Sequence, residues 1–282
     1  MKPVRTTALL AILAALFAGA GFLLAGPRGA ILALIVAAAI NFATFWAADR
    51  AVLRLHKARA VGPRQCPELH GLVAALARRA RLPMPRLYII DSPHPNAFAT
   101  GRDPHHAAIA LTTGLLGLLT RDEIEGVVAH ELGHIRAHDT RLMTAVATLA
   151  GAISMLASFG SVGRRSHPLA LLLSVIVAPL AAMLIQLAIS RSREYQADAA
   201  GALISGKPHA LASALAKLAA GAQATPDPVT RRVPAMAQLY IASPLKGTAS
   251  LFATHPDPAD RIAALHTIAV PAKRPSALDP FA

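Results

Sequence analysis

The sequence predicts a mainly α-helical, polytopic membrane protein in which two transmembrane helical hairpins accompany an α+β domain with a small β-sheet. Hydrophobic residues make up 54% of the 282 residues and charged residues 15%, whereas an ordinary soluble domain has roughly 25% charged residues. Four apolar stretches are each close to the roughly 20 residues that span a bilayer core. Helical and extended patterns lie between and after these stretches.

The first two apolar stretches, Thr7 to Gly26 and Ala30 to Ala48, predict a hairpin because Pro27-Arg28-Gly29 makes a tight turn between them. A signal peptide is the alternative for the first stretch, since Ala18-Gly19-Ala20 resembles a cleavage site. In either case the second stretch leads the following segment to the same side of the membrane.

The segment after this hairpin predicts a small α+β unit. Pro67 to Arg81 has apolar residues along one side of a helix, and Arg86 to Ile90 and Ala107 to Leu111 are expected strands. Between the strands, Ser92 to Gly101 predicts a turn and then a short extended run. For residues 97–100, a plain hairpin strand and an edge that holds another extended chain both stay open.

An H-E-x-x-H pattern, His130 to His134, lies inside a predicted amphipathic helix that begins with a capping box from Thr120 to Glu123. Two histidines four residues apart lie about 40° apart around a helix, so both imidazoles can reach one metal ion. Glu131 is placed to hold a metal-bound water. The pattern predicts the site of a zinc hydrolase, and two ordinary helix histidines are the alternative.

A zinc hydrolase site needs a third protein ligand and an open position for water. Downstream of the histidine pair, Glu194 is the one remaining glutamate, and it is therefore the predicted third ligand. Asp198 lies one helical turn further on, where its carboxylate can accept the free N–H of a ligating histidine and fix its tautomer. A solvated, charged helix end at Arg193, Glu194 and Asp198 is the alternative.

The second apolar pair, Leu142 to Gly160 and Pro168 to Ile189, lies between the predicted ligands. Because His134 and Glu194 must meet at one metal, the chain between them has to leave and return, which requires an even number of crossings. A second transmembrane hairpin meets this requirement, and two buried helices of a soluble core are the alternative. Further on, Lys207 to Ala222 predicts a helix, and Ala224 to Pro244 an irregular, proline-bearing segment.

Taken in order, these motifs resemble the HtpX-type membrane zinc metalloproteases, relatives of the CAAX prenyl proteases. The resemblance covers most of residues 1 to 270 and rests on the apolar pairs and on several motifs, namely Asn96 to Gly101, His130 to His134, Glu194 with Asp198, and Thr254-His255-Pro256 followed by Arg261. It implies a zincin-type catalytic domain with one Zn²⁺ on His130, His134 and Glu194, and with Glu131 as the catalytic base. It also implies that His255 and Arg261 lie near the oxyanion. The strand expected to border the substrate cleft consists of Asn96, Ala97, Phe98, Ala99 and Thr100.

The expected domain organisation follows from these elements. It comprises the N-terminal transmembrane hairpin (1–50), two parts of a cytoplasmic zinc protease domain (51–141 and 191–270), the second transmembrane hairpin (142–190) and a flexible, proline-bearing tail (271–282).

The net charge of +13 does not indicate a nucleic-acid-binding protein, because aromatic residues are only 4% and no groove-reading motif is visible. Basic residues instead flank the apolar stretches, which suits anionic lipid headgroups. The positive-inside rule then predicts a multi-pass protein of the bacterial inner membrane with its catalytic domain facing the cytoplasm, although Arg164 and Arg165 count against this orientation. A single cysteine, Cys66, excludes an internal disulfide and suits a reducing compartment.

The sequence thus predicts a membrane-embedded zinc metalloendopeptidase that hydrolyses polypeptide substrates, with misfolded or damaged membrane proteins as the expected targets in stress-related quality control. A catalytically silent zinc-binding scaffold is the alternative, and Glu131 argues against it because a pure binding protein has no use for a glutamate between its ligands. A prenyl-peptide endoprotease is a third interpretation, for a larger chain with more membrane spans. Cleavage preference, oligomeric state and the choice among divalent metals are open.

Overall fold

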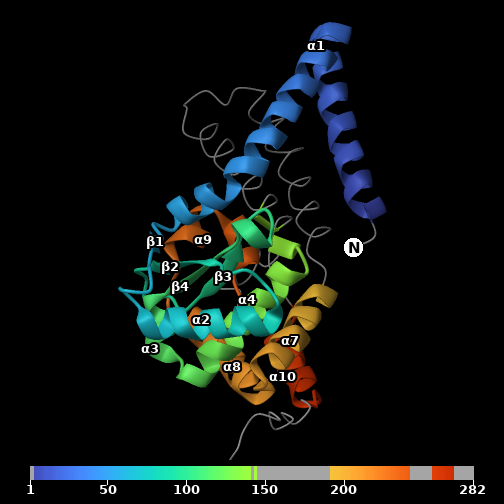
Figure 1. The fold of residues 1–282 in the computed structure, drawn as a ribbon. Coiled ribbons are helices and arrows are strands. Elements are labelled where there is room, and N and C mark those ends of the chain that lie inside the picture. The colour runs from blue at the N-terminus through green and yellow to red at the C-terminus, as the bar shows by residue number, and fades with distance from the viewer. Residues whose placement is uncertain (1–2, 141–142, 145–190, 242–255, 270–282) are drawn as a thin grey trace, which may run out of the picture.

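The computed structural model describes residues 3–140, 143–144, 191–241 and 256–269 of the chain (Figure 1). Nearly all of the second predicted hairpin lies outside the described residues, as do His255 and the C-terminal tail. Within the described ranges the fold is mainly helical with one small mixed sheet, which confirms that part of the predicted fold class.

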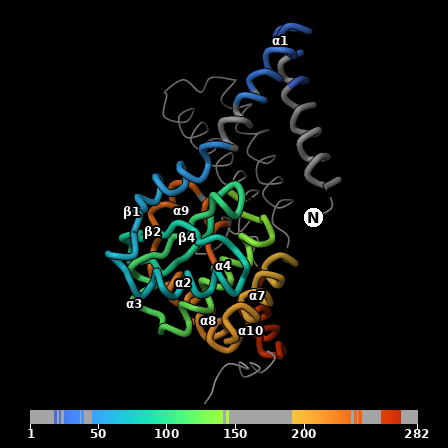
Figure 2. Tube along the Cα trace, in the orientation of Figure 1, coloured from blue at the N-terminus to red at the C-terminus, as the bar shows by residue number. Residues whose placement is uncertain are grey.

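The first helix, α1 (Pro3–Leu55), runs through both N-terminal apolar stretches and is broken at Ala25 and Gly26. Gly26 has a φ of 61°, a left-handed conformation that glycine adopts without steric cost. Pro27 then begins the second arm, and Figures 1 and 2 show the second arm running back from the bend at which the two arms meet. The break thus lies just before the turn expected at residues 27–29.

No helix in the described ranges meets the length and apolarity of a membrane-crossing segment. The polytopic arrangement therefore stays a prediction.

The sheet has four strands in the order β1-β2-β4-β3. These are β1 (Arg59–Ala60), β2 (Arg86–Ile90), β3 (Ala97–Thr100) and β4 (Ala108–Thr112). β2 and β4 are parallel, whereas β1 and β3 are antiparallel to their neighbours. β3 is therefore an edge strand, and its pairing sets Ala99 opposite Ile109 of β4.

The two faces of the sheet belong to different cores, because alternate strand residues point to opposite sides. Ala97 and Ala99 of β3 face the larger core with α2 (Pro67–Ala80) and α4 (Arg121–Arg136). Phe98 faces a smaller core that includes the end of α1 and the 3₁₀-helix η2 (Pro234–Leu239). The remaining helices are η1 (Pro104–His106), α3 (Thr113–Leu118), α7 (Arg191–Ser205), α8 (Pro208–Ala224), α9 (Pro228–Arg232) and α10 (Pro258–His266).

α4 lies at the centre of the larger core, in contact with α2, α7, α8 and β3. Its start has the predicted capping box, in which Thr120 accepts from the Glu123 N–H and the Glu123 carboxylate accepts from the Thr120 N–H. Every residue from Gly126 to Ile135 is buried, so the helix is enclosed on all sides rather than exposed along one face as an amphipathic helix would be.

α7 crosses α4 at small residues, which brings its polar side chains to the histidine pair. A Cβ atom on Gly201 would lie 2.9 Å from the backbone nitrogen and Cα of His130, and one on Gly133 would lie 3.2 Å from the Ala197 carbonyl oxygen. The two glycines therefore allow an approach that larger residues would prevent.

Candidate metal centre

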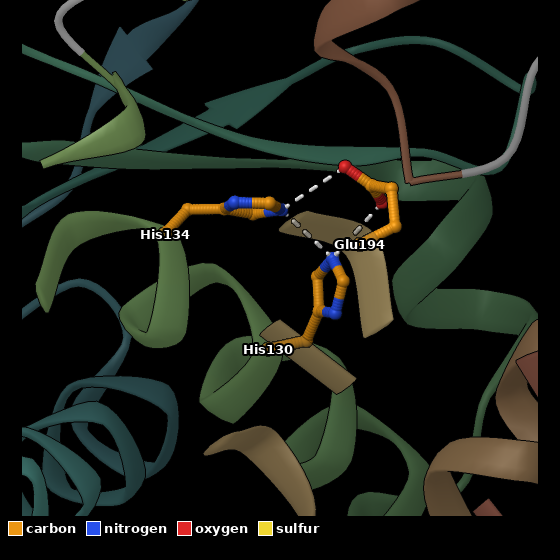
Figure 3. A group of neighbouring side chains, drawn as sticks. All are labelled: His130, His134 and Glu194. Atoms are coloured by element: carbon orange, nitrogen blue, oxygen red, sulfur yellow. Dashed lines mark hydrogen bonds and ion pairs between the residues drawn. The ribbon is translucent and has the colours of Figure 1, made fainter. Parts of the chain in front are cut away.

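Three buried side chains from α4 and α7 converge on one point (Figure 3). The Nε2 atoms of His130 and His134 lie 3.2 Å apart. Glu194 places Oε1 at 3.5 Å from Nε2 of His134 and Oε2 at 3.8 Å from Nε2 of His130. These separations suit a tetrahedral zinc ion, whose bonds of about 2.0–2.1 Å set ligand atoms about 3.3 Å apart.

The outer ring nitrogens of both histidines face carboxylates. Nδ1 of His130 lies 2.9 Å from Oδ1 of Asp198, and Nδ1 of His134 lies 3.4 Å from Oδ2 of Asp139. An ionised carboxylate only accepts hydrogen bonds, so we assign the proton of each neutral ring to Nδ1. When both rings are neutral, their Nε2 lone pairs point into the same small space, where a cation can bind both.

The electrostatic balance of the site also favours a positive charge between these residues. Burial alone would lower the pKa of His134, but the carboxylates of Glu194, Asp139 and Glu131 outweigh it and raise the pKa to about 9. A site that stabilises an extra proton so strongly stabilises a divalent cation for the same reason. The donor set of two imidazoles and one carboxylate therefore fits zinc.

Glu131 lies beside the three possible ligands and is only 3% exposed. Burial raises the pKa of its carboxyl group above the usual range, against the opposing effect of His130 and His134. The carboxylate also accepts a hydrogen bond from the backbone N–H of Ala99 in β3. The group expected to move a proton is thus joined to the strand expected to hold substrate.

Arg261 lies behind the site, on α10, with 1% of its surface exposed. Its Nε and Nη2 atoms each donate to the Asp198 carboxylate at 2.8 Å, and Nη1 donates to the carbonyl oxygen of Ile241 at 2.9 Å. Two carboxylates thus engage the guanidinium, Asp198 and Glu194, the latter at 3.6 Å, and the expectation that Arg261 lies near the oxyanion stays a prediction. Arg261 is therefore positioned to orient the carboxylate of Asp198. His255, the other residue expected near the oxyanion, is not among the described residues.

Asp139, which contacts His134, was not anticipated from the sequence. It follows the end of α4, where His138 has a φ of 60° and reverses the chain so that the carboxylate turns back toward the ring. Its other oxygen lies 3.4 Å from Nη1 of Arg193 on α7. The available signal was that Asp139 is the first carboxylate after the histidine pair.

The expected substrate strand borders this site through its backbone. The Ala97 carbonyl accepts from the Ile241 N–H at 3.4 Å, and Phe98 points to the smaller core, where its ring stacks on Tyr240. Asn96 donates its N–H to Thr112, and Thr100 bonds to Thr144 through their hydroxyl groups. Among these residues, Ala99 is the one that lines the space at the metal ligands.

That space is small. It measures about 10 Å³, and Leu239, Tyr240 and Ile241 line it together with Ala99 and Glu131. A cavity of this size has room for about one water molecule.

The chain is similar to one protein family and to one solved structure. The model of the family described as Peptidase family M48 matches residues 63–269. A crystal structure of S. mikatae Ste24p aligns over 92% of this chain with a TM-score of 0.49 and 22% sequence identity. The chain covers 62% of the length of that protein.

Proposed function

The chain belongs to peptidase family M48, and from that premise we propose that it is a membrane-embedded zinc metalloendopeptidase. The observation that carries this proposal is the position of Glu131 beside the convergent atoms of His130, His134 and Glu194. Two imidazoles and a carboxylate leave one tetrahedral position open, which is typical of catalytic rather than structural zinc sites.

The proposed reaction is the addition of water to a peptide carbonyl, followed by loss of the amine. The chemistry that a bound zinc ion supplies is Lewis acidity, which makes water nucleophilic near neutral pH and polarises the carbonyl. Glu131 takes the proton of the attacking water on its carboxylate and delivers it to the departing nitrogen as the C–N bond breaks. The raised pKa of Glu131 suits both halves of this transfer.

The residues around the ligands hold this geometry. Asp198 and Asp139 fix the two imidazoles in the tautomer that presents Nε2 to the metal. The backbone of Ala97 to Thr100 holds an extended substrate in β-augmentation, which places a peptide bond next to Glu131. Two imidazoles and a carboxylate also suit other divalent ions, and activity restored to chelated protein by zinc at stoichiometric amounts would support zinc.

The test of the proposed reaction distinguishes the role of Glu131 as a catalytic base from the role of Glu194 as a metal ligand. Glu131→Gln should retain the metal and lose nearly all cleavage of an unfolded test protein, because the ligands are untouched and the proton carrier is gone. Glu194→Ala should lose the metal itself. Metal loss in Glu131→Gln, or full metal retention in Glu194→Ala, would contradict these roles. A wild-type protein that binds zinc and cleaves nothing would favour the catalytically silent scaffold.

We place the enzyme in the bacterial inner membrane, with two transmembrane hairpins and a cytoplasmic catalytic domain that acts on misfolded or damaged membrane proteins. The apolar stretches of the sequence and the folded-back arms of α1 support this placement. Ser161→Cys or Ser166→Cys should react with a membrane-impermeant thiol reagent added outside cells, whereas Cys66 and Ala210→Cys should not. Protection of residues 161 and 166 would exclude this topology.

A further inference from the structure

A second cavity of about 270 Å³ lies on the face of the sheet opposite α4. Its walls come from the end of α1, the ends of β2 and β4, the segment between β2 and β3, α9, and Tyr240 directly after η2. The lining includes apolar residues such as Leu55, Ile90 and Val229 together with six buried polar residues, namely His56, His94, Asn96, Thr112, Asp227 and Tyr240. No step of the proposed reaction uses this cavity.

Two of these side chains carry buried acceptor atoms that find no hydrogen-bond partner among the described residues, Nε2 of His94 and Oδ1 of Asn96. Nδ1 of His94 lies 2.8 Å from the carbonyl oxygen of Thr225, and a carbonyl can only accept. His94 therefore has its proton on Nδ1 and presents a lone pair on Nε2. Because an unsatisfied buried polar atom is energetically costly, a ligand with hydrogen-bond donors gains by pairing with it.

The inner wall also carries a negative charge. Asp227 accepts from the Tyr240 hydroxyl at 2.7 Å and from the backbone N–H groups of Thr230 and Val229. Burial would raise the pKa of Asp227, but these hydrogen bonds lower it below the usual value, so the carboxylate is ionised at neutral pH. Burial lowers the pKa of His56, which leaves that ring neutral.

The cationic side chains that line the cavity, Lys57 and Arg232, are exposed. Water and salt therefore screen their charges more strongly than that of Asp227. The interior thus combines one carboxylate with two neutral acceptors, which suits an ammonium or guanidinium group.

The cavity is also positioned beside the expected path of a substrate. Tyr240 lines both this cavity and the space at the metal ligands. Asn96 directly precedes β3 and is three residues from Ala99, a distance of about 10 Å along an extended strand. A peptide paired with β3 would therefore bring a residue two or three positions from the scissile bond next to Asn96.

We propose that this cavity is a specificity subsite for a lysine or arginine side chain of the substrate, two or three residues from the cleaved bond. The inference rests on the proposed peptidase activity and names a feature of its substrates. Lysine and arginine are abundant where membrane proteins meet the cytoplasm, so such a subsite would direct cleavage to the flanks of transmembrane segments.

The test uses quenched fluorescent peptides and the zinc-loaded wild-type protein. At each position within three residues of the cut, lysine is compared with norleucine, which lacks the ammonium group, and with Nε-acetyl-lysine, which keeps the nitrogen but adds an acetyl group and removes the charge. One position should show kcat/KM about tenfold higher for lysine than for either neutral residue. Equal values at every position would overturn the subsite while leaving the peptidase intact, whereas no cleavage of any peptide would overturn the proposed function.

A variant pair then assigns the preference to the cavity. Asp227→Asn keeps the shape of the side chain and should reduce the lysine-to-norleucine ratio of kcat/KM to about one or two. Asp260→Asn removes an exposed carboxylate on α10, away from the cavity, and should leave the ratio at its wild-type value. A full lysine preference in Asp227→Asn would place the subsite elsewhere.

Discussion

Asp198 binds His130 and Arg261 at the same time. Its Oδ1 atom lies 2.9 Å from Nδ1 of His130 and accepts from Nη2 of Arg261 at 2.8 Å. Burial would raise the pKa of Asp198, but the hydrogen bonds from Arg261 and His130 lower it. Arg261 thus keeps Asp198 ionised, and an ionised Asp198 keeps the His130 proton on Nδ1.

This relationship predicts unequal effects at the two carboxylates that orient the histidines. Asp198→Asn should weaken zinc binding roughly 10- to 100-fold, because the amide no longer requires the His130 proton to be on Nδ1. Asp139→Asn should have a smaller effect, since its contact with His134 is longer, 3.4 Å. Competition with a chromophoric chelator measures both affinities. A larger loss in Asp139→Asn would contradict the ranking.

The close crossing of α4 and α7 predicts that Gly201→Ala lowers both stability and zinc affinity. The added methyl group would lie 2.9 Å from the His130 backbone and push away the helix that carries Glu194. Overpacking of this kind costs about 1–3 kcal/mol. The control is Gly71→Ala, an exposed position in α2 with open space around it, which should gain about 0.5–1 kcal/mol. Denaturant unfolding and zinc titration of both variants check the prediction, and equal behaviour would refute it.

The lowered pKa of Glu123 predicts that this residue contributes to folding stability in a way that depends on pH. Burial would raise its pKa, but hydrogen bonds from Lys217, Ser213 and Thr120 lower it from the ordinary 4.5 to about 2. Because the folded value is the lower one, the stabilisation is fully present above pH 4.5 and is lost as the pH falls toward about 2. The difference in unfolding free energy between wild type and Glu123→Gln should therefore shrink across this window. A difference that stays constant from about pH 6 to about pH 3 would show that the Glu123 charge is unimportant.

Substitutions of Ala99 should separate the effect of its backbone on proteolysis from the effect of its side chain. Ala99→Pro removes the N–H that Glu131 accepts and locks φ, so proteolysis should fall sharply while the zinc ligands are untouched. Ala99→Ser keeps the N–H and should be mild. Cleavage rates and zinc content of both variants are the measurements. If the proline variant were as active as the serine variant, substrate would have to bind elsewhere.

The local features of the metal site could be predicted from the sequence because they depend on residues close together in the chain. The spacing of His130 and His134 and the capping box at Thr120 are properties of one helix. The spacing of Glu194 and Asp198 on α7 likewise predicts that both face the same neighbour. Strands β2 and β4 also agree with their predicted ranges within one residue.

Features that depend on tertiary contacts could not be predicted. Asp139 reaches His134 only because His138 adopts a left-handed conformation that is uncommon outside glycine. The contact of His56 with Tyr240 joins segments far apart in the sequence. The segment 224–244, expected to be irregular, contains α9 and η2, which pack on the sheet through Met236 and Tyr240. Nothing in the local pattern indicates that packing.

Because Glu194 lies on α7, a metal bound to it and to His134 would also lower the conformational entropy of the unfolded chain. His134 and Glu194 are about 60 residues apart in the sequence, so an ion that ligates both closes a large loop. For a covalent cross-link, a loop of this length restricts the unfolded chain by about 4 kcal/mol. A chelator would remove this restraint along with the ligand bonds. Chelation should therefore loosen the contact between the two halves of the domain as well as stop the reaction.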